Sequence, residues 1–299
     1  MARAAGTLWP SLGLAMVGAL WGLYWLPTHW MQAHGLGPAW MSLIISAFTL
    51  LATAPLLIRE RATLHRVDGR VLLTGVCLSG AFSLYGVSLT QTSVVSAILL
   101  FYLSPVWSTL MDLWFNGERL RPQRVMALLL GLAGLVTVLG FEQGLPVPRL
   151  LGDWLALISG VVWAYGSIRS YAGNGAGITG NVLAFNVGSA VTSLALILLL
   201  PAASGAVPDS ATLQATLPAL AVLSLVFVLP SNYLVIWATQ KLPAPRVGIL
   251  LMTEVVAGTA SAALLAGEPF GARQVSGSLL IVAAGVFEVM GRQDKTVTV

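Results

Sequence analysis

The sequence predicts an all-α integral membrane protein, in which ten membrane-spanning helices form two inverted five-helix repeats around a central cavity. Three observations support this fold class: an apolar composition, ten long apolar segments, and motifs that recur about 150 residues apart. Of the 299 residues, 57% are hydrophobic and 9% are charged, whereas about a quarter of the residues in a soluble domain carry charge. A spanning helix needs about 20 apolar residues, so ten spans use about 200 and leave about 100 for loops.

The apolar segments follow one another along the chain, each bounded by charged residues, Gly or Pro. The predicted spans are 11–32, 38–58, 69–89, 93–115, 122–140, 152–172, 179–200, 212–236, 245–265 and 272–291. The first is too long for the apolar region of a signal peptide, so we expect it to remain as an uncleaved helix. The single cysteine, Cys77, excludes an intramolecular disulfide and any multi-cysteine metal or iron–sulfur site.

The basic residues test the number and order of these spans, because Lys and Arg concentrate in cytoplasmic connections. With the N-terminus inside, the outside connections hold only Arg149 and Arg273. The other basic residues fall inside: Arg3, Arg59, Arg61, Arg66, Arg70, Arg119, Arg121, Arg124, Arg169, Lys241, Arg246, Arg292 and Lys295. The sequence therefore predicts a multi-pass protein of the plasma (inner) membrane with both termini cytoplasmic. The net charge of +4 is spread over many connections and forms no single patch, which argues against nucleic-acid binding.

A duplicated five-helix unit is indicated by motifs that recur at offsets of 149 to 151 residues. Gly117-Glu118 recurs as Gly267-Glu268, Thr90-Gln91 as Thr239-Gln240, and Gly134 and Gly140 as Gly285 and Gly291. Because five is odd, the second copy must enter the membrane from the opposite side. We expect the first repeat to occupy residues 1–145 and the second residues 146–299. Inverted repeats are typical of secondary transporters, whose halves rearrange around a central site.

Three stretches carry a resemblance to a known superfamily: Trp21-Gly22, Leu103-Ser104-Pro105-Val106, and Gly117-Glu118 before a Gly-rich fifth span. They resemble the drug/metabolite transporter superfamily, within it the EamA-like ten-helix exporters, and among these the YddG-type aromatic amino-acid exporters. The resemblance implies export of small amphipathic metabolites, amino acids including aromatic ones, by alternating access. Met252-Thr253-Glu254-Val255 stands where the Leu-x-Pro-Val stretch would recur, so we do not expect strict functional symmetry.

Polar and aromatic side chains within the spans are candidates for a substrate site, because they would be costly facing lipid. The predicted substrate-binding residues are Trp21, Tyr24, Ser79, Ser83, Tyr85, Tyr102, Trp163, Asn186, Asn232 and Glu254. Such a lining suits amino acids, whose zwitterion needs hydrogen bonds and whose side chain needs apolar contacts. The alternative for each residue is helix packing or a hydrogen bond to a neighbouring helix. Glu254, midway along its span, either packs there or serves as a carboxylate that binds a substrate amine or carries a proton.

Two further carboxylates, Asp112 and Glu288, lie near predicted inner span ends and are expected to form salt bridges or helix-end contacts there. Pro27, Pro105 and Pro230 interrupt apolar spans and are predicted hinges, since proline removes a backbone donor and frees a carbonyl one turn earlier.

The sequence predicts no enzyme, cofactor or metal site, because it contains neither a G-x-x-x-x-G-K-[ST] loop nor an H-E-x-x-H motif. The expected partners are a small-molecule substrate, such as an amino acid or similar metabolite, and the lipid bilayer. Oligomeric state is left open. The alternatives are a carrier of other metabolites or drugs and, with less support, a channel or an intramembrane enzyme.

Overall fold

Helices account for every regular element in the described part of the chain, as the composition predicts. The computed structural model describes residues 2–60, 65–115, 117, 121–140, 148–266 and 270–290, and no strand occurs in these ranges. In chain order the elements are α1 (Ala2–Trp21), α2 (Trp25–Ala33), α3 (Pro38–Arg59), α5 (Gly69–Gln91), α6 (Val94–Phe101), α7 (Ser104–Phe115), α8 (Pro122–Leu139), α9 (Leu151–Ala172), α10 (Gly177–Leu199), α11 (Pro201–Ser204), α12 (Ser210–Val222), the π-helical segment η1 (Leu223–Val228), α13 (Leu229–Thr239), α14 (Ala244–Leu251), α15 (Thr253–Ala266) and α16 (Ala272–Met290).

Nine helical segments within the described residues are long and apolar enough to cross a membrane. They coincide with the second to tenth predicted spans, and their bounds differ from the predicted ones by at most three residues. The first predicted span, 11–32, needs correction, because the structure divides it between α1 and α2 and begins α1 already at Ala2. The reason is local. Pro27 has no N–H to donate, and in a regular helix its ring would clash with the carbonyl oxygen of Leu23, so the helix is interrupted before this residue.

Capping residues explain several helix boundaries. Asp68 begins α5 by accepting hydrogen bonds from the backbone N–H groups of Arg70 and Val71, and Asp209 caps α12 by accepting from Thr212. At the other ends, α8 stops at Gly140 and α9 at Gly173, both with φ of +81°. This left-handed conformation costs glycine little and other residues more, so each glycine terminates its helix.

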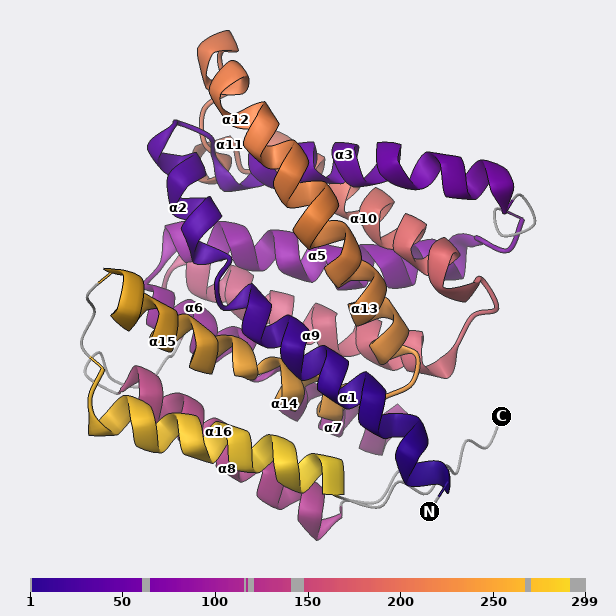
Figure 1. Cartoon of the computed structure of the whole chain (residues 1–299), viewed down its shortest axis with the longest axis vertical. Coiled ribbons are helices and arrows are strands. Elements are labelled where there is room, and N and C mark those ends of the chain that lie inside the picture. The colour runs from indigo at the N-terminus through magenta and orange to yellow at the C-terminus, as the bar shows by residue number, and fades with distance from the viewer. Residues whose placement is uncertain are drawn as a thin grey trace.

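The chain alternates between two ends of the bundle. The ribbon of α1 begins, and that of α16 ends, at the right-hand end in Figure 1. We call this the inner end, because the prediction places both termini in the cytoplasm. The described basic residues at or beside helix ends on this side are Arg59, Arg66, Arg70, Arg121, Arg124, Arg169, Lys241 and Arg246. Arg149 and Arg273 begin the opposite ends of α9 and α16, so the alternation follows the predicted one.

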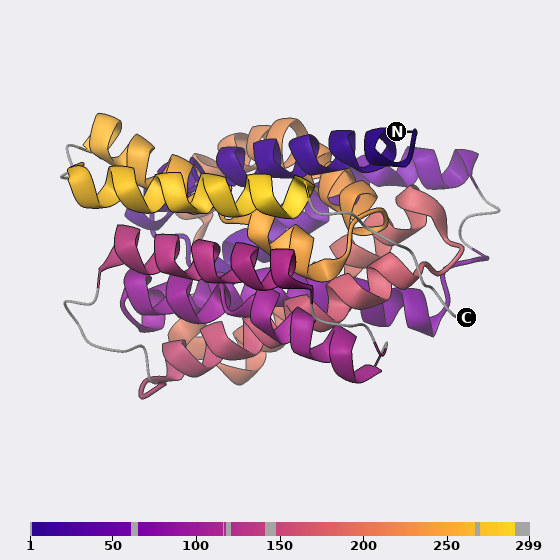
Figure 2. The ribbon, with the colours of Figure 1, turned by 90° about the horizontal axis from the view of Figure 1, so that it is seen from below.

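The helices α8 and α16 run alongside each other in both views (Figures 1 and 2). They meet through glycine: a Cβ placed on Gly134 would lie 2.7 Å from the carbonyl oxygen of Gly277. Such small residues let membrane helices approach backbone to backbone. The fifth and tenth spans thus form one closely packed pair.

Several predicted features lie outside the described residues. These are Glu118, Gly267 and Glu268 of the recurring turns, Gly291, the boundary between residues 145 and 146, and Arg61, Arg119, Arg292 and Lys295.

Candidate substrate site

Two spans are broken at positions 150 residues apart. The fourth span is interrupted between α6 and α7 at Tyr102 and Leu103, and the ninth between α14 and α15 at Met252. A turn replaces the helix at each point: Val106 N–H donates to the Leu103 carbonyl, and Val255 N–H donates to that of Met252. Equivalent breaks at one offset are consistent with the inverted repeat.

Each break packs against the first helix of the other half. A Cβ on Gly160 of α9 would lie 2.8 Å from the carbonyl oxygen of Phe101, and one on Gly18 of α1 would lie 3.1 Å from that of Leu251. The backbones therefore approach as closely as glycine allows. The break of the first half therefore lies against α9 of the second half, and the break of the second half lies against α1 of the first half.

Tyr102 and Glu254 connect the two breaks by a hydrogen bond. The hydroxyl of Tyr102 donates to Oε2 of Glu254 at 2.6 Å, with the carbonyl oxygen of Leu251 also within reach at 3.0 Å. Tyr102 is only 1% exposed. A carboxylate in the middle of a membrane span is costly to remove from water and needs a hydrogen-bonding or charged partner. Such residues usually belong to functional sites. The structure thus brings together two of the predicted site residues that are 152 positions apart.

Aromatic rings fill the space next to this pair. Trp21 stacks on Phe82 with ring centroids 5.3 Å apart and planes 15° apart, and Trp163 meets the same ring edge-on at 5.0 Å. Tyr24 stacks on Phe227 at 6.0 Å, and Phe227 also contacts Trp21. Three of the predicted aromatic residues, Trp21, Tyr24 and Trp163, are therefore in contact through Phe82 and Phe227.

A second stack leads from this cluster to the carboxylate. Tyr85 lies over Phe101 with centroids 4.6 Å apart, and Phe101 meets Tyr102 edge-on at 5.2 Å. Tyr85, Phe101, Tyr102 and Trp163 belong to one buried cluster, with Trp21 and Phe82 packed against it. Trp163 and Tyr102 are each 1% exposed, so in this conformation these two rings are shielded from solvent.

The ring of Trp21 carries a polar atom without a partner. The indole Nε1 of Trp21 is buried and has no hydrogen-bond acceptor among the described residues. Buried donors are almost always paired in native structures, so an orphan of this kind calls for an explanation. A substrate oxygen is one acceptor that would satisfy it.

The predicted amides and hydroxyls lie further along the helices. Asn232 of α13 donates to Oδ1 of Asn186 of α10 at 3.2 Å, and both side chains are buried. Ser79 donates to the Gly75 carbonyl of its own helix, while Ser83 lies 3.4 Å from the hydroxyl of Ser193. Asn186, Asn232 and Ser83 thus join helices to one another, whereas Ser79 bonds within α5, and the four are not in the aromatic cluster.

Ser83 belongs to a larger set of hydroxyls between α3, α5 and α10. Ser46 donates to Ser189 at 2.8 Å, and Ser42 lies 3.4 Å from Ser83 and 3.5 Å from Ser189. The sequence interpretation missed Ser42, Ser46, Ser189 and Ser193. The usable signal was their spacing, because each helix contributes two serines four residues apart, which lie on one helical face.

The three prolines lie at or just after irregular backbone. Pro27 follows the break between α1 and α2, Pro105 is the second residue of α7, and Pro230 is the second residue of α13 directly after the π-helical segment η1. In a π-helical segment the backbone hydrogen bonds join residues five apart instead of four, and such segments mark places where an α-helix is irregular or kinked. Their role as hinges stays a prediction.

The carboxylates near the inner end form an ionic cluster. Asp112 pairs with Arg124 at 4.0 Å, as expected for a carboxylate at a span end, and both side chains are largely buried. Glu288 of α16 is attracted by Arg124 and by Arg246 of α14. Arg246 is 1% exposed, and its Nε and Nη2 have no acceptor in the described part of the chain. Ile249, one turn along α14, packs with Ala127 and Ala284, so this side of α14 faces α8 and α16.

Comparison with known proteins gives a match to one family and matches to solved structures. Residues 8–140 match the EamA-like transporter family, so the match ends where α8 ends. A solved structure entitled "Crystal structure of protein" is similar over 95% of this chain and 96% of that chain, with a TM-score of 0.73 and 21% identity, which shows a shared fold. No curated protein matches. The family match supports the drug/metabolite transporter superfamily, and it makes the first five predicted spans of this all-α membrane protein similar to the EamA-like transporter family.

Proposed function

We propose that the chain is a secondary transporter that exports small amphipathic metabolites, above all amino acids including aromatic ones, by alternating access. The family match suggests a membrane transporter of small molecules. The observation that carries the finer proposal is the Tyr102–Glu254 hydrogen bond, which joins the broken helices of the two halves beside a cluster of aromatic rings.

The chemistry of this centre fits the parts of an amino acid. The carboxylate of Glu254 offers a charged acceptor for an ammonium group, and charge-assisted hydrogen bonds of this kind contribute about 1.5–3 kcal/mol. The rings around Phe82 offer faces and edges to an apolar or aromatic side chain, at about 0.5–1.5 kcal/mol for each ring pair. The orphan indole N–H of Trp21 offers a donor to a carboxylate oxygen.

The backbone around the centre supports alternating access. In transporters with inverted repeats, discontinuous helices line the site and one half rocks against the other. Here the interrupted fourth and ninth spans each contact the first helix of the opposite half, through Gly160 and Gly18. Rearrangement of either contact opens the centre towards one side of the membrane while the other stays packed.

Exchange in liposomes tests the proposal. Purified protein is reconstituted with unlabelled substrate inside, and uptake of labelled Trp, Phe, Thr and Met is followed with and without a pH gradient. We expect selective exchange of aromatic amino acids. Exchange of none of the four would refute the amino-acid assignment and favour the alternative, a carrier of other metabolites or drugs.

Substrate analogues test the role of Glu254. We expect Glu254→Gln to weaken exchange of Trp, which has an ammonium group, and to leave 3-indolepropionate, which lacks one, unchanged. Asp209→Asn is the matched control, because it also removes one carboxylate charge but lies in the cap of α12 outside the predicted spans. Equal losses for both compounds would contradict the ammonium-binding role.

A further inference from the structure

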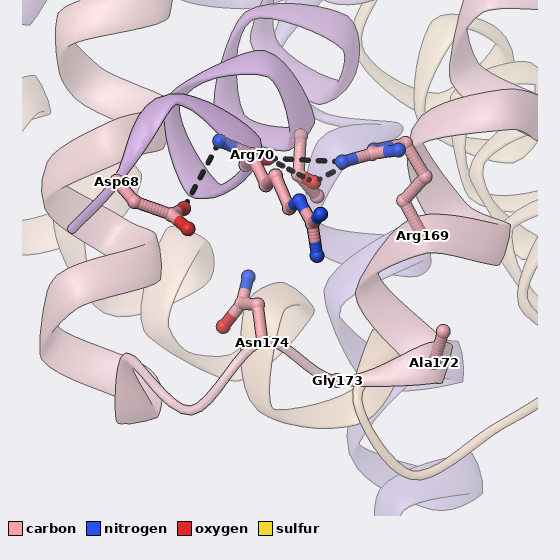
Figure 3. Close-up of a pocket in the computed structure, with 7 residues that line it drawn as sticks. Asp68, Arg70, Arg169, Ala172, Gly173 and Asn174 are labelled. Atoms are coloured by element: carbon pink, nitrogen blue, oxygen red, sulfur yellow. Dashed lines mark hydrogen bonds between the residues drawn. The ribbon is translucent and has the colours of Figure 1, made fainter. Parts of the chain in front are cut away.

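A pocket of about 330 Å³ lies at the inner end, away from the aromatic centre. It is formed where α5 begins and α9 ends, and it is lined by Asp68, Arg70, Thr74, Arg169 and Asn174 among others (Figure 3). Arg169 follows Trp163 of the centre by six residues, about 9 Å along the helix axis. The pocket therefore joins the inner ends of two helices, α5 of the first predicted repeat and α9 of the second.

Arg169 is held in place by neutral groups only. Its Nε donates to Oγ1 of Thr74 at 3.2 Å, its Nη2 to the carbonyl oxygen of Arg70 at 3.3 Å, and its Nη1 to the hydroxyl of Tyr165 at 3.4 Å. Its guanidinium carbon also lies 5.6 Å from the centre of the Tyr165 ring. These contacts fix the orientation of the guanidinium, but none of them balances its charge.

Arg70 adds a second positive charge. Figure 3 shows its guanidinium extending between Asp68, Asn174 and Arg169. Within the described residues no carboxylate lies within 4.0 Å of it, and none of its side-chain nitrogens makes a hydrogen bond. The carboxylate of Asp68 is engaged in capping α5, where Oδ1 accepts from the N–H groups of Arg70 at 3.0 Å and Val71 at 2.9 Å. The pocket thus holds two guanidinium groups against one carboxylate.

The opposite wall is rigid. Asn174 donates to Oδ1 of Asn181 at 2.7 Å and accepts from Nδ2 of Asn181 at 2.9 Å, and its Oδ1 also accepts from the N–H of Ala176 at 3.2 Å. This fixed amide pair holds the loop after α9 against the start of α10. An occupant of the pocket therefore meets preorganised walls and one adjustable side chain, Arg70.

We propose that this pocket binds a phosphate-bearing anion. The paired N–H donors of a guanidinium group can bind two oxygens of a phosphate at once, and basic pockets between membrane helices at the cytoplasmic side bind anionic lipid headgroups. The pocket lies at the end of the bundle where the prediction places the cytoplasmic leaflet, so a lipid headgroup and a soluble phosphate compound both have access to it. A bound phosphate bridges Arg70 and Arg169 and braces α5 against α9, the helices that carry Phe82 and Trp163.

Binding to the purified, full-length protein tests this inference independently of transport. Retention of phosphatidylglycerol, compared with phosphatidylcholine, is measured by native mass spectrometry, and inorganic phosphate is titrated separately while the thermal midpoint is followed. We expect Arg70→Gln to weaken binding of the anion about fivefold, the effect of one basic residue at a membrane surface. Arg66→Gln is the matched control, because it removes the same charge from an exposed residue just before α5 that is not among those lining the pocket.

Asp68→Asn gives a test in the opposite direction. It removes the competing negative charge while the amide oxygen retains the cap of α5, so we expect tighter binding of the anion. Preference for phosphatidylglycerol identifies a lipid headgroup as the source, and an equal response to inorganic phosphate identifies a soluble one. Binding that Arg70→Gln and Arg66→Gln weaken to the same extent, or no binding of either probe, would overturn the proposal.

Discussion

Gly22→Ala is the sharpest test of how the two halves fit together. Gly22 lies in the break between α1 and α2, against the first turn of α15. A Cβ at this position would lie 2.5 Å from the carbonyl oxygen of Glu254, 2.6 Å from the backbone nitrogen of Gly258 and 2.8 Å from Cβ of Ala257. Two of these three neighbours are backbone atoms, so no side-chain rotation relieves the clash.

The size of the effect follows from these distances. Ordinary contact begins at 3.4 Å, so α1 and α15 would have to separate by about 0.9 Å. Overpacking of this kind costs about 1–3 kcal/mol, and three simultaneous contacts place Gly22→Ala towards the upper end. For a protein of this size we expect the midpoint of thermal unfolding to fall by about 3–5 °C. Transport should be lost as well, because the displaced segment carries Glu254.

Gly86→Ala provides the matched control. Gly86 lies within α5, and a Cβ there meets no heavy atom within 4 Å. The same substitution should therefore leave stability unchanged or raise it by up to about 1 kcal/mol, because alanine favours the helix. Both variants are compared by thermal unfolding in one detergent. Equal midpoints and equal transport for the two variants would refute the close approach of α1 and α15.

Three further perturbations test other parts of the structure. Tyr102→Phe removes the hydroxyl that a substrate ammonium group has to displace from Glu254. It should therefore strengthen substrate affinity about tenfold to a hundredfold, from the 1.5–3 kcal/mol of a hydrogen bond to a charged group, and an unchanged KM for exchange would contradict this. Arg246→Met should destabilise the protein by about 3–5 kcal/mol, because it leaves the buried carboxylate of Glu288 with one fewer positive charge nearby. In a double-mutant cycle followed by thermal unfolding, adding Glu288→Met should restore part of the lost stability. Additive losses would show that the two charges do not interact. The backbone N–H of Thr212 holds the pKa of Asp209 below its ordinary value. The stabilisation that this cap contributes is therefore complete above the unfolded pKa and is lost as the pH falls through the folded pKa. The protection of the amides at the start of α12, corrected for the intrinsic exchange rate at each pH, should fall in acid, and pH-independent protection there would count against the cap.

The bounds of the spans could be predicted because they depend on local properties. Composition and the alternation of basic residues fix where a segment enters and leaves the membrane, and nine spans agree within three residues. The breaks are less visible. Pro105 indicates the break between α6 and α7. No proline lies near Met252 in the ninth span, where the break depends on packing against Gly18. Tertiary contacts of this kind leave no periodic trace in the sequence.

The candidate site shows the same division. Trp21, Tyr102, Trp163 and Glu254 could be selected because ionisable and amphipathic side chains are conspicuous in an apolar span. Phe82, whose ring contacts both Trp21 and Trp163, could not be selected, because a phenylalanine in a membrane helix is ordinary until its neighbours are known. Pairing across 152 residues, as in the Tyr102–Glu254 hydrogen bond, requires the fold itself.

The backbone of the site is nearly symmetric, whereas its chemistry is not. Tyr102 stands in the break of the fourth span, and its counterpart at the offset of 150 is Met252, two residues before Glu254. Each half therefore contributes a different part of the polar pair: the first half gives the donor and the second half gives the acceptor. Because the bond exists only when the two breaks are adjacent, a rocking motion that separates the halves must break it and expose the carboxylate. In the proposed mechanism, an ammonium group that replaces the tyrosine donor would compensate for that loss, which would give the substrate a direct energetic role in opening the centre.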